Sequence, residues 1–266
     1  MTLSFPLARE GFHAPGIEEF EWPNLVDLEL FGLNLGINKV VLLMFLAAAL
    51  VYLLFWLAFH RVQLVPTGRL TNLMESGVDF VRNQIVLEVI GRDGLRFVPY
   101  LCTLFFFIFV GNVFGVLPFV NFPVNGRMAL PAVMALSSWA VFNAVGIASQ
   151  GLGPYLRNTL FPPGLPLPLY LLVTPIEFIS TLIVRPVTLA IRLLANMIAG
   201  HLILSVFFVA TGYMLTSMNI STLFGVGALV FSVALVAFEL FVAALQAYVF
   251  TILTAVYIAG ALEPEH

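Results

Sequence analysis

The chain has 266 residues, of which 61% are hydrophobic and 9% are charged. Soluble domains carry roughly 25% charged residues, so this composition excludes a protein whose surface is solvated mainly by water, and lipid must be the solvent for most of the chain. The formal net charge of −3 argues against nucleic acid as a partner, because phosphate binding needs clustered Lys and Arg. The single cysteine, Cys102, excludes an intrachain disulfide and a cluster of metal-binding thiolates, and no cofactor or metal is expected.

Residues 1–36 are acidic and are interrupted by Pro6, Pro15 and Pro23. No cationic stretch leads into an apolar core there, so the segment is not typical of a signal peptide. We expect an extracytoplasmic polar arm at 1–36, followed by a membrane domain at 37–266.

Apolar runs long enough to cross a membrane define the rest of the chain, because ~30 Å of hydrocarbon at a rise of ~1.5 Å per residue needs about 20 residues. The fold class that they predict is an all-α polytopic membrane protein. About five membrane helices are expected, at residues 37–59, 97–117, 129–148, 175–213 and 221–261.

The loop after the first crossing carries both a charge signal and an amphipathic pattern. Five of the eleven basic residues lie between residues 60 and 96, so the positive-inside rule puts this loop in the cytoplasm, the N-terminus outside and the C-terminus inside. Leu70, Met74, Val78, Val81 and Ile85 recur at helical spacing. This predicts an interfacial amphipathic helix over residues 67–90 that lies on the inner membrane face.

The last two apolar runs are too long for an upright crossing. A helix from 175 to 213 would measure ~58 Å at ~1.5 Å per residue, so both helices are expected to be strongly tilted. Thr174, Pro175 and Glu177 predict the start of the first one, with Thr as N-cap and Glu completing a capping box. Pro186 should bend that helix, because proline lacks a backbone donor.

Ionisable and amide side chains inside these two runs are the candidate functional residues, because intramembrane charges are rare and expensive. Glu177 and Arg185 also have structural explanations, as a helix cap and as a side chain that reaches the headgroups. The set comprises Glu177, Arg185, Arg192, Asn196, His201, Glu239 and Gln246.

Arg192 differs from the other charges because its guanidinium stays protonated at any working pH and lies roughly 26 Å along the helix from Pro175. The acids that could compensate it within the chain are Glu239 and Glu177. At ~100° per residue, His201 points about 180° away from Arg192.

An antiparallel pairing of the two long helices puts Glu239 level with His201 and Gln246 beside Arg192. A buried His/Glu pair can relay protons as a coupled unit. The alternative is a satisfied ion pair that only fixes helix packing.

Three segments resemble subunit a of F-type ATP synthases. RPVTLAIRLLANMIAGH runs from Arg185 to His201, FELFVAALQAYVFTILTAVYI from Phe238 to Ile258, and GNVFGVLP, from Gly111 to Pro118, resembles the family's second-hairpin motif. The resemblance implies a proton-translocating stator subunit with two half-channels, located in the inner (plasma) membrane. It also implies two long helices lying nearly flat against a rotor ring.

The resemblance further implies roles for single residues. Arg192 would be the essential arginine facing the ring, and Asn196, His201, Glu239 and Gln246 would line the entry half-channel. Many bacterial members have Glu at the position of His201 and His at that of Glu239, so this chain has the swapped pair. Apart from the resemblance, Glu177 lies near the cytoplasmic end of its helix, and it is expected to border the exit path together with Arg185. The implied partners are the rotor c-ring, the peripheral-stalk b subunits, the whole synthase complex and lipid, with no ATP chemistry in this chain.

An ion-coupled secondary transporter is the alternative function. Such transporters usually contain a repeated pair of broken helices, and the sequence has no such repeat. An intramembrane enzyme would need a metal or nucleophile motif, and neither HExxH nor GxSxG with a partner histidine occurs.

Overall fold

The computed structural model describes Gly16 and residues 29–30, 33–34, 38–60, 68–117, 124–161, 167–216 and 221–262. The predicted arm at 1–36 therefore lies almost wholly outside the described residues. In chain order the elements are β1 (Glu29–Leu30), β2 (Leu33–Asn34), α1 (Lys39–Phe59), α2 (Arg69–Phe80), η2 (Val81–Leu87), η3 (Arg92–Phe97), α3 (Val98–Val116), η4 (Val124–Gly126), α4 (Ala129–Gln150), α5 (Leu152–Leu160), α6 (Leu167–Ile179), η5 (Ser180–Val184), α7 (Arg185–Thr216) and α8 (Ser221–Leu262).

Among the described residues, five helices are long and apolar enough to cross a membrane, which confirms the predicted all-α polytopic fold. They span Lys39–Phe59, Arg92–Val116, Ala129–Gln150, Leu169–Thr216 and Thr222–Leu262. The described strands, β1 and β2, are two residues long each and pair with one another in antiparallel fashion.

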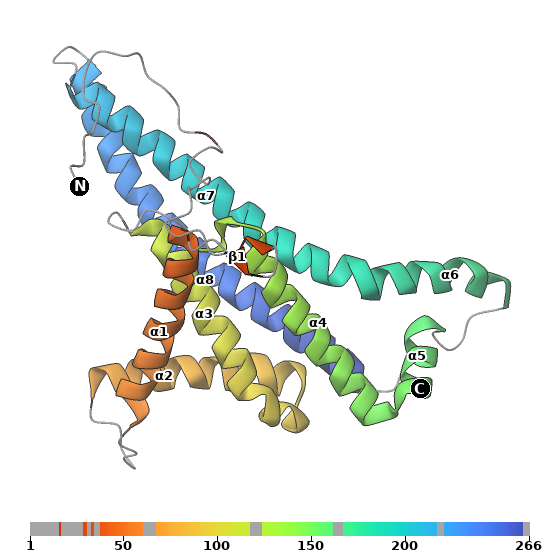
Figure 1. The fold of residues 1–266 in the computed structure, drawn as a ribbon. Helices are drawn as coiled ribbons and strands as arrows, with labels where there is room; N and C mark the ends of the chain where they lie inside the picture. The colour runs from red at the N-terminus through yellow and green to blue at the C-terminus, as the bar shows by residue number, and fades with distance from the viewer. Residues whose placement is uncertain are drawn as a thin grey trace.

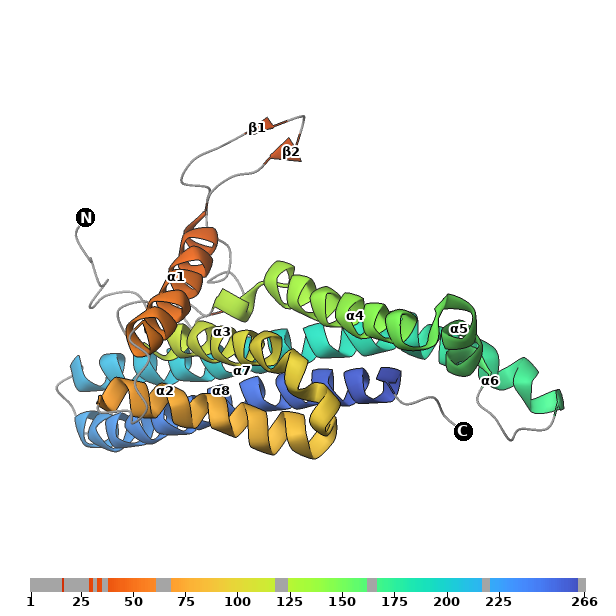
Figure 2. The same cartoon turned by 90° about the horizontal axis from the view of Figure 1, so that it is seen from below.

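The last two membrane helices form an antiparallel pair, which Figures 1 and 2 show side by side. Contacts along the pair fix its register. Thr211 Oγ1 lies 3.4 Å from Ser232 Oγ, and the Arg185 guanidinium lies over the Tyr257 ring at 5.3 Å from its centroid. Helices α3 and α4 pack on this pair, and the buried core of the molecule lies between them.

The interfacial helix has the predicted amphipathic pattern. It comprises α2 and the π-helical segment η2, and its apolar residues Met74, Val81 and Ile85 are buried in the core. Its polar residues, among them Glu75 and Asp79, are exposed. Figure 1 shows this helix running across the lower ends of α1 and α3, at an angle to the α7–α8 pair.

The fourth membrane helix begins earlier than predicted. Pro175 lies inside α6, which starts at Leu167, so the predicted N-cap at Thr174 and capping box with Glu177 are wrong. The reason is that a proline inside a membrane helix removes one hydrogen bond, and neighbouring groups can satisfy the backbone carbonyl that it leaves open. The short helix α5, which starts after Gly151 at a φ of +84°, was not predicted either.

The long fourth helix bends, as Pro186 predicted, but the bend takes the form of a π turn. The π-helical residues of η5 lie directly before Arg185 and Pro186. Figure 1 shows α6 turned away from the axis of α7. A wider turn is one way for a helix to accommodate a proline ring that would otherwise clash with the preceding turn.

Candidate functional site

The α7–α8 interface brings the predicted His201 and Glu239 to the same level. The Glu239 carboxylate is packed against the Cα of Gly200, so that a Cβ at this position would overlap it. His201 and Glu239 are 3% and 5% exposed, respectively. The absence of a side chain at Gly200 is what lets the carboxylate reach the α7 backbone beside the histidine.

Polar side chains continue this interface on both sides of Glu239. Ser205 Oγ lies 3.5 Å from His201 Nε2, and the contact between Thr211 and Ser232 lies further along toward the turn between the helices. Gln246, on the other side, is 7% exposed. The interface therefore carries a line of polar groups through otherwise apolar helices.

Several atoms of this line are buried without a hydrogen bond to any described residue. They are Asn196 Nδ2, Glu239 Oε1 and Gln246 Nε2. Buried polar atoms in proteins are almost always hydrogen-bonded, and ordered water usually completes those that side chains leave open. These three atoms therefore keep hydrogen-bonding capacity that no described side chain fills.

Arg192 points away from His201 on α7, because the two residues are nine positions apart on one helix. Its side chain is exposed whereas that of His201 is buried, in agreement with the opposite faces expected from helical geometry. Within the described residues, Arg192 forms no ion pair or hydrogen bond. Three exposed positions within two turns of Arg192 on this face carry small side chains, namely Thr188, Ala195 and Ala199.

Glu177 and Arg185 meet in a separate cavity of about 350 Å³. Its walls come from α4, α5, α6, α7 and α8. The other polar residues of the lining are Gln150, Tyr155, Asn158, Thr159 and Tyr257. The π turn lies between Glu177 and Arg185 in the chain.

Helix α5 closes this cavity through Tyr155. The Tyr155 hydroxyl donates to Asn143 Oδ1 at 3.0 Å, and its ring is packed against Gly146, where a Cβ would overlap it. Burial raises the pKa of Tyr155, and this shift is opposed by a hydrogen bond with Thr159 and by the charge of Arg185. The hydroxyl is thus a neutral donor around pH 7.

Further buried amides link the helices around the site. Asn125 Nδ2 donates to Asn112 Oδ1 at 2.6 Å, and Asn112 Nδ2 lies 3.5 Å from the Ala243 carbonyl, one helical turn from Glu239. Both asparagines are fully buried. The sequence pattern did not single out Asn125, because it lies in a short connection and not in an apolar run.

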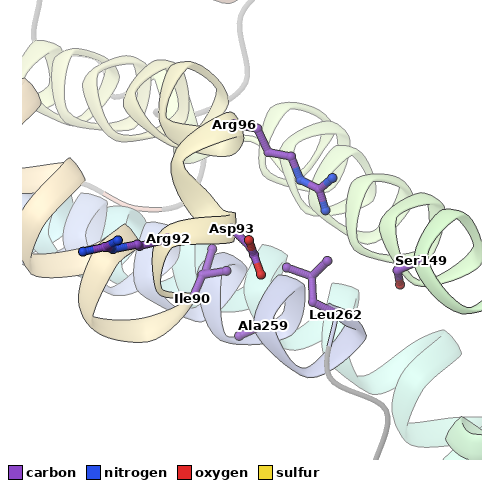
Figure 3. Close-up of a pocket in the computed structure, with 7 residues that line it drawn as sticks. All are labelled: Ile90, Arg92, Asp93, Arg96, Ser149, Ala259 and Leu262. Atoms are coloured by element: carbon purple, nitrogen blue, oxygen red, sulfur yellow. The ribbon is translucent and has the colours of Figure 1, made fainter.

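Another cavity, of about 620 Å³, lies where the interfacial helix leads into α3. Figure 3 shows Asp93 and Arg96 turned toward it and the Arg92 guanidinium turned away. Ser149, Ala259 and Leu262 complete its far wall. None of the predicted site residues lines it. Among the described residues, no group of His, Cys, Asp or Glu side chains is arranged to hold a metal ion.

Comparison with known proteins gives one consistent result. The family described as ATP synthase A chain matches residues 41–259. ATP synthase subunit a of Frankia alni is 47% identical over 96% of this chain and 88% of its own length. The subunits a of Rhodococcus erythropolis and of a Nocardioides species are each 41% identical, over 99% and 100% of this chain and 96% and 100% of their own lengths.

Proposed function

The chain belongs to the ATP synthase A chain family and is a proton-translocating stator subunit of the ATP synthase complex, and from this premise we propose that Arg192 is the fixed cation that faces a carboxylic acid of the moving rotor ring. The transporter alternative is not supported by these relatives.

The exposure of Arg192 without a counter-ion carries this proposal. A guanidinium inside the hydrocarbon region costs from about 2.5 to above 10 kcal/mol, so a compensating acid is required. No described residue of this chain supplies one. The small side chains of Thr188, Ala195 and Ala199 beside it leave room for a helix of another subunit.

In this mechanism the rotor acid travels through lipid in its neutral form, because an ionised carboxylate is costly to desolvate there. Beside Arg192 the ionised form is favoured by the positive charge, and the acid loses its proton. The permanent charge of Arg192 also repels a proton that would cross directly from one side to the other. Each proton must therefore cross while it is bound to the rotor acid, as the ring rotates.

The outside half-channel in this proposal is the polar line at the α7–α8 interface. Asn196, His201, Glu239 and Gln246 line it, and the open hydrogen-bonding atoms of Asn196, Glu239 and Gln246 would hold waters there. The buried His201 and Glu239 can exchange a proton as a coupled pair. This explains why one acid and one imidazole lie at the same level.

The inside half-channel is the cavity that Glu177 and Arg185 share. Along α7, Arg192 lies between this cavity and the level of His201, so the two aqueous paths would end on either side of the arginine. The transmembrane potential supplies ~2.3 kcal/mol per charge per 100 mV to a proton that takes this route. Ring rotation converts this energy to torque.

The proposed orientation follows the charge of the loop between α1 and α3. Its five arginines put it in the cytoplasm of the cell, with the N-terminus outside and the C-terminus inside. The rotor c-ring and the peripheral-stalk b subunits are the proposed direct partners within the plasma membrane.

The test is Arg192→Ala in the assembled complex in vesicles. ATP synthesis driven by an imposed proton gradient should be abolished. Thr188→Ala, one turn away on the same exposed face, is the matched control and should retain synthesis. Normal proton-driven synthesis in the Arg192→Ala complex would refute the role given to the arginine.

A further inference from the structure

The π turn between α6 and α7 contains a carbonyl that its own helix cannot satisfy. In η5 the backbone N–H of Arg185 donates to the Ser180 carbonyl, five residues earlier. The next donor in this pattern is residue 186, which would serve the Thr181 carbonyl. Residue 186 is proline and has no N–H. The Thr181 carbonyl therefore has no donor from the π ladder.

Trp139 of α4 provides the missing donor. Its Nε1–H donates to the Thr181 carbonyl at 3.2 Å. Thr181 is buried, so water is a poor substitute for this donor. A tryptophan indole that is partly buried usually finds such a partner, and here the partner is a backbone group left open by a proline.

The π turn decides which way Glu177 faces relative to Arg185. Eight residues of regular α-helix would separate their directions by about 80°. A π turn takes up about one extra residue, which reduces the separation to about 20°. Both side chains then face the same cavity, as the structure shows.

We propose that Trp139 is a positioning residue for the inside half-channel. Its indole N–H holds the π turn at residues 180–184, and the turn keeps Glu177 and Arg185 on the wall of one cavity. The proposal rests on the proton role proposed above for that cavity. Trp139 itself is not among the residues that line it.

The functional test is Trp139→Phe in the assembled complex, which removes the N–H and keeps an aromatic ring. Proton-driven ATP synthesis should fall about fivefold, the equivalent of one hydrogen bond. The dependence of the rate on inside pH should change, whereas the dependence on outside pH should not. The control is Tyr100→Phe, which removes hydroxyl contacts to Ser137 and Ser138 of α4 without touching the π turn. It should change neither profile.

A double-mutant cycle tests the cause. Pro186→Ala restores a backbone donor to the turn, so the indole is no longer needed. In the Pro186→Ala background, Trp139→Phe should have little further effect on synthesis or on the inside-pH profile. Losses that multiply independently would overturn the proposal.

A structural measurement separates this proposal from the proton role of the cavity. Replacing Cys102, the only cysteine, by alanine allows a single cysteine to be placed by Glu177→Cys and labelled with a water-soluble maleimide from the inside. Adding Trp139→Phe should lower the labelling rate several-fold, and an unchanged rate overturns the proposal. A lowered rate together with an unchanged inside-pH profile in Trp139→Phe would confirm the anchor and contradict the proton role of the cavity.

Discussion

The carboxylate of Glu239 lies against the Cα of Gly200, so that the acid from α8 reaches the backbone of α7 directly before His201. This contact sets the distance between the two longest helices at the level where the imidazole and the acid are both buried. Gly200 has no charge of its own, but the geometry of the proposed outside half-channel depends on the space that its missing side chain leaves.

Gly200→Ala is therefore expected to impair proton transport. The added methyl group overlaps the carboxylate, and overpacking of this kind typically costs about 1–3 kcal/mol, so a loss of about tenfold in proton-driven synthesis is expected. Gly212→Ala is the matched control on the same helix, because nothing lies within 4 Å of its added Cβ. Equal rates for the two variants in vesicles would show that the contact with Glu239 has no functional consequence.

Exchange of the buried pair provides a second prediction. His201→Glu puts two acids at one level and Glu239→His puts two imidazoles there, so each single variant should lose most ATP-driven proton pumping. The double variant His201→Glu, Glu239→His again has one acid and one imidazole, and pumping should recover in large part. If the double variant is as inactive as the worse single variant, the two residues do not act as a pair.

The cavity of Glu177 and Arg185 predicts different effects for two of its side chains. Glu177→Gln removes a group that can hold a proton, so synthesis should fall several-fold with a changed dependence on inside pH. Tyr155→Phe should leave the pH profile unchanged, because burial raises the pKa of this hydroxyl and keeps it neutral in the working range. An altered profile in Tyr155→Phe, or an unaltered one in Glu177→Gln, would contradict this division.

Tyr155→Phe should still reduce stability, because the hydroxyl donates to Asn143. A hydrogen bond of this kind is worth about 0.5–1.5 kcal/mol. The folded chain holds the tyrosine proton more tightly than the unfolded chain does. The contribution of the raised tyrosine pKa to stability is thus complete at pH values below the ordinary tyrosine pKa of about 10. It declines as the pH rises above that value. Thermal unfolding of the complex in detergent at pH 7 measures the loss.

The sequence by itself determined the class of protein, the number of crossings and the side chains that carry charge within them. These properties depend on the hydropathy of each segment alone, because lipid requires every spanning segment to be an apolar helix that satisfies its own backbone groups. Helical periodicity also predicted that Arg192 and His201 face opposite sides, because ~100° per residue holds along an uninterrupted helix. The same regular geometry predicted that an antiparallel pairing of the two long helices puts Glu239 level with His201.

Only the tertiary structure decided where that regularity breaks. The start of α6 before Pro175 and the π turn before Pro186 depend on what neighbouring helices supply, such as the indole N–H of Trp139. Glu177 and Arg185 line one cavity because of the π turn between them, and α5 supplies another wall of that cavity. A proline signal in the sequence marks a missing donor but does not say which residue replaces it, because that residue comes from a distant part of the chain.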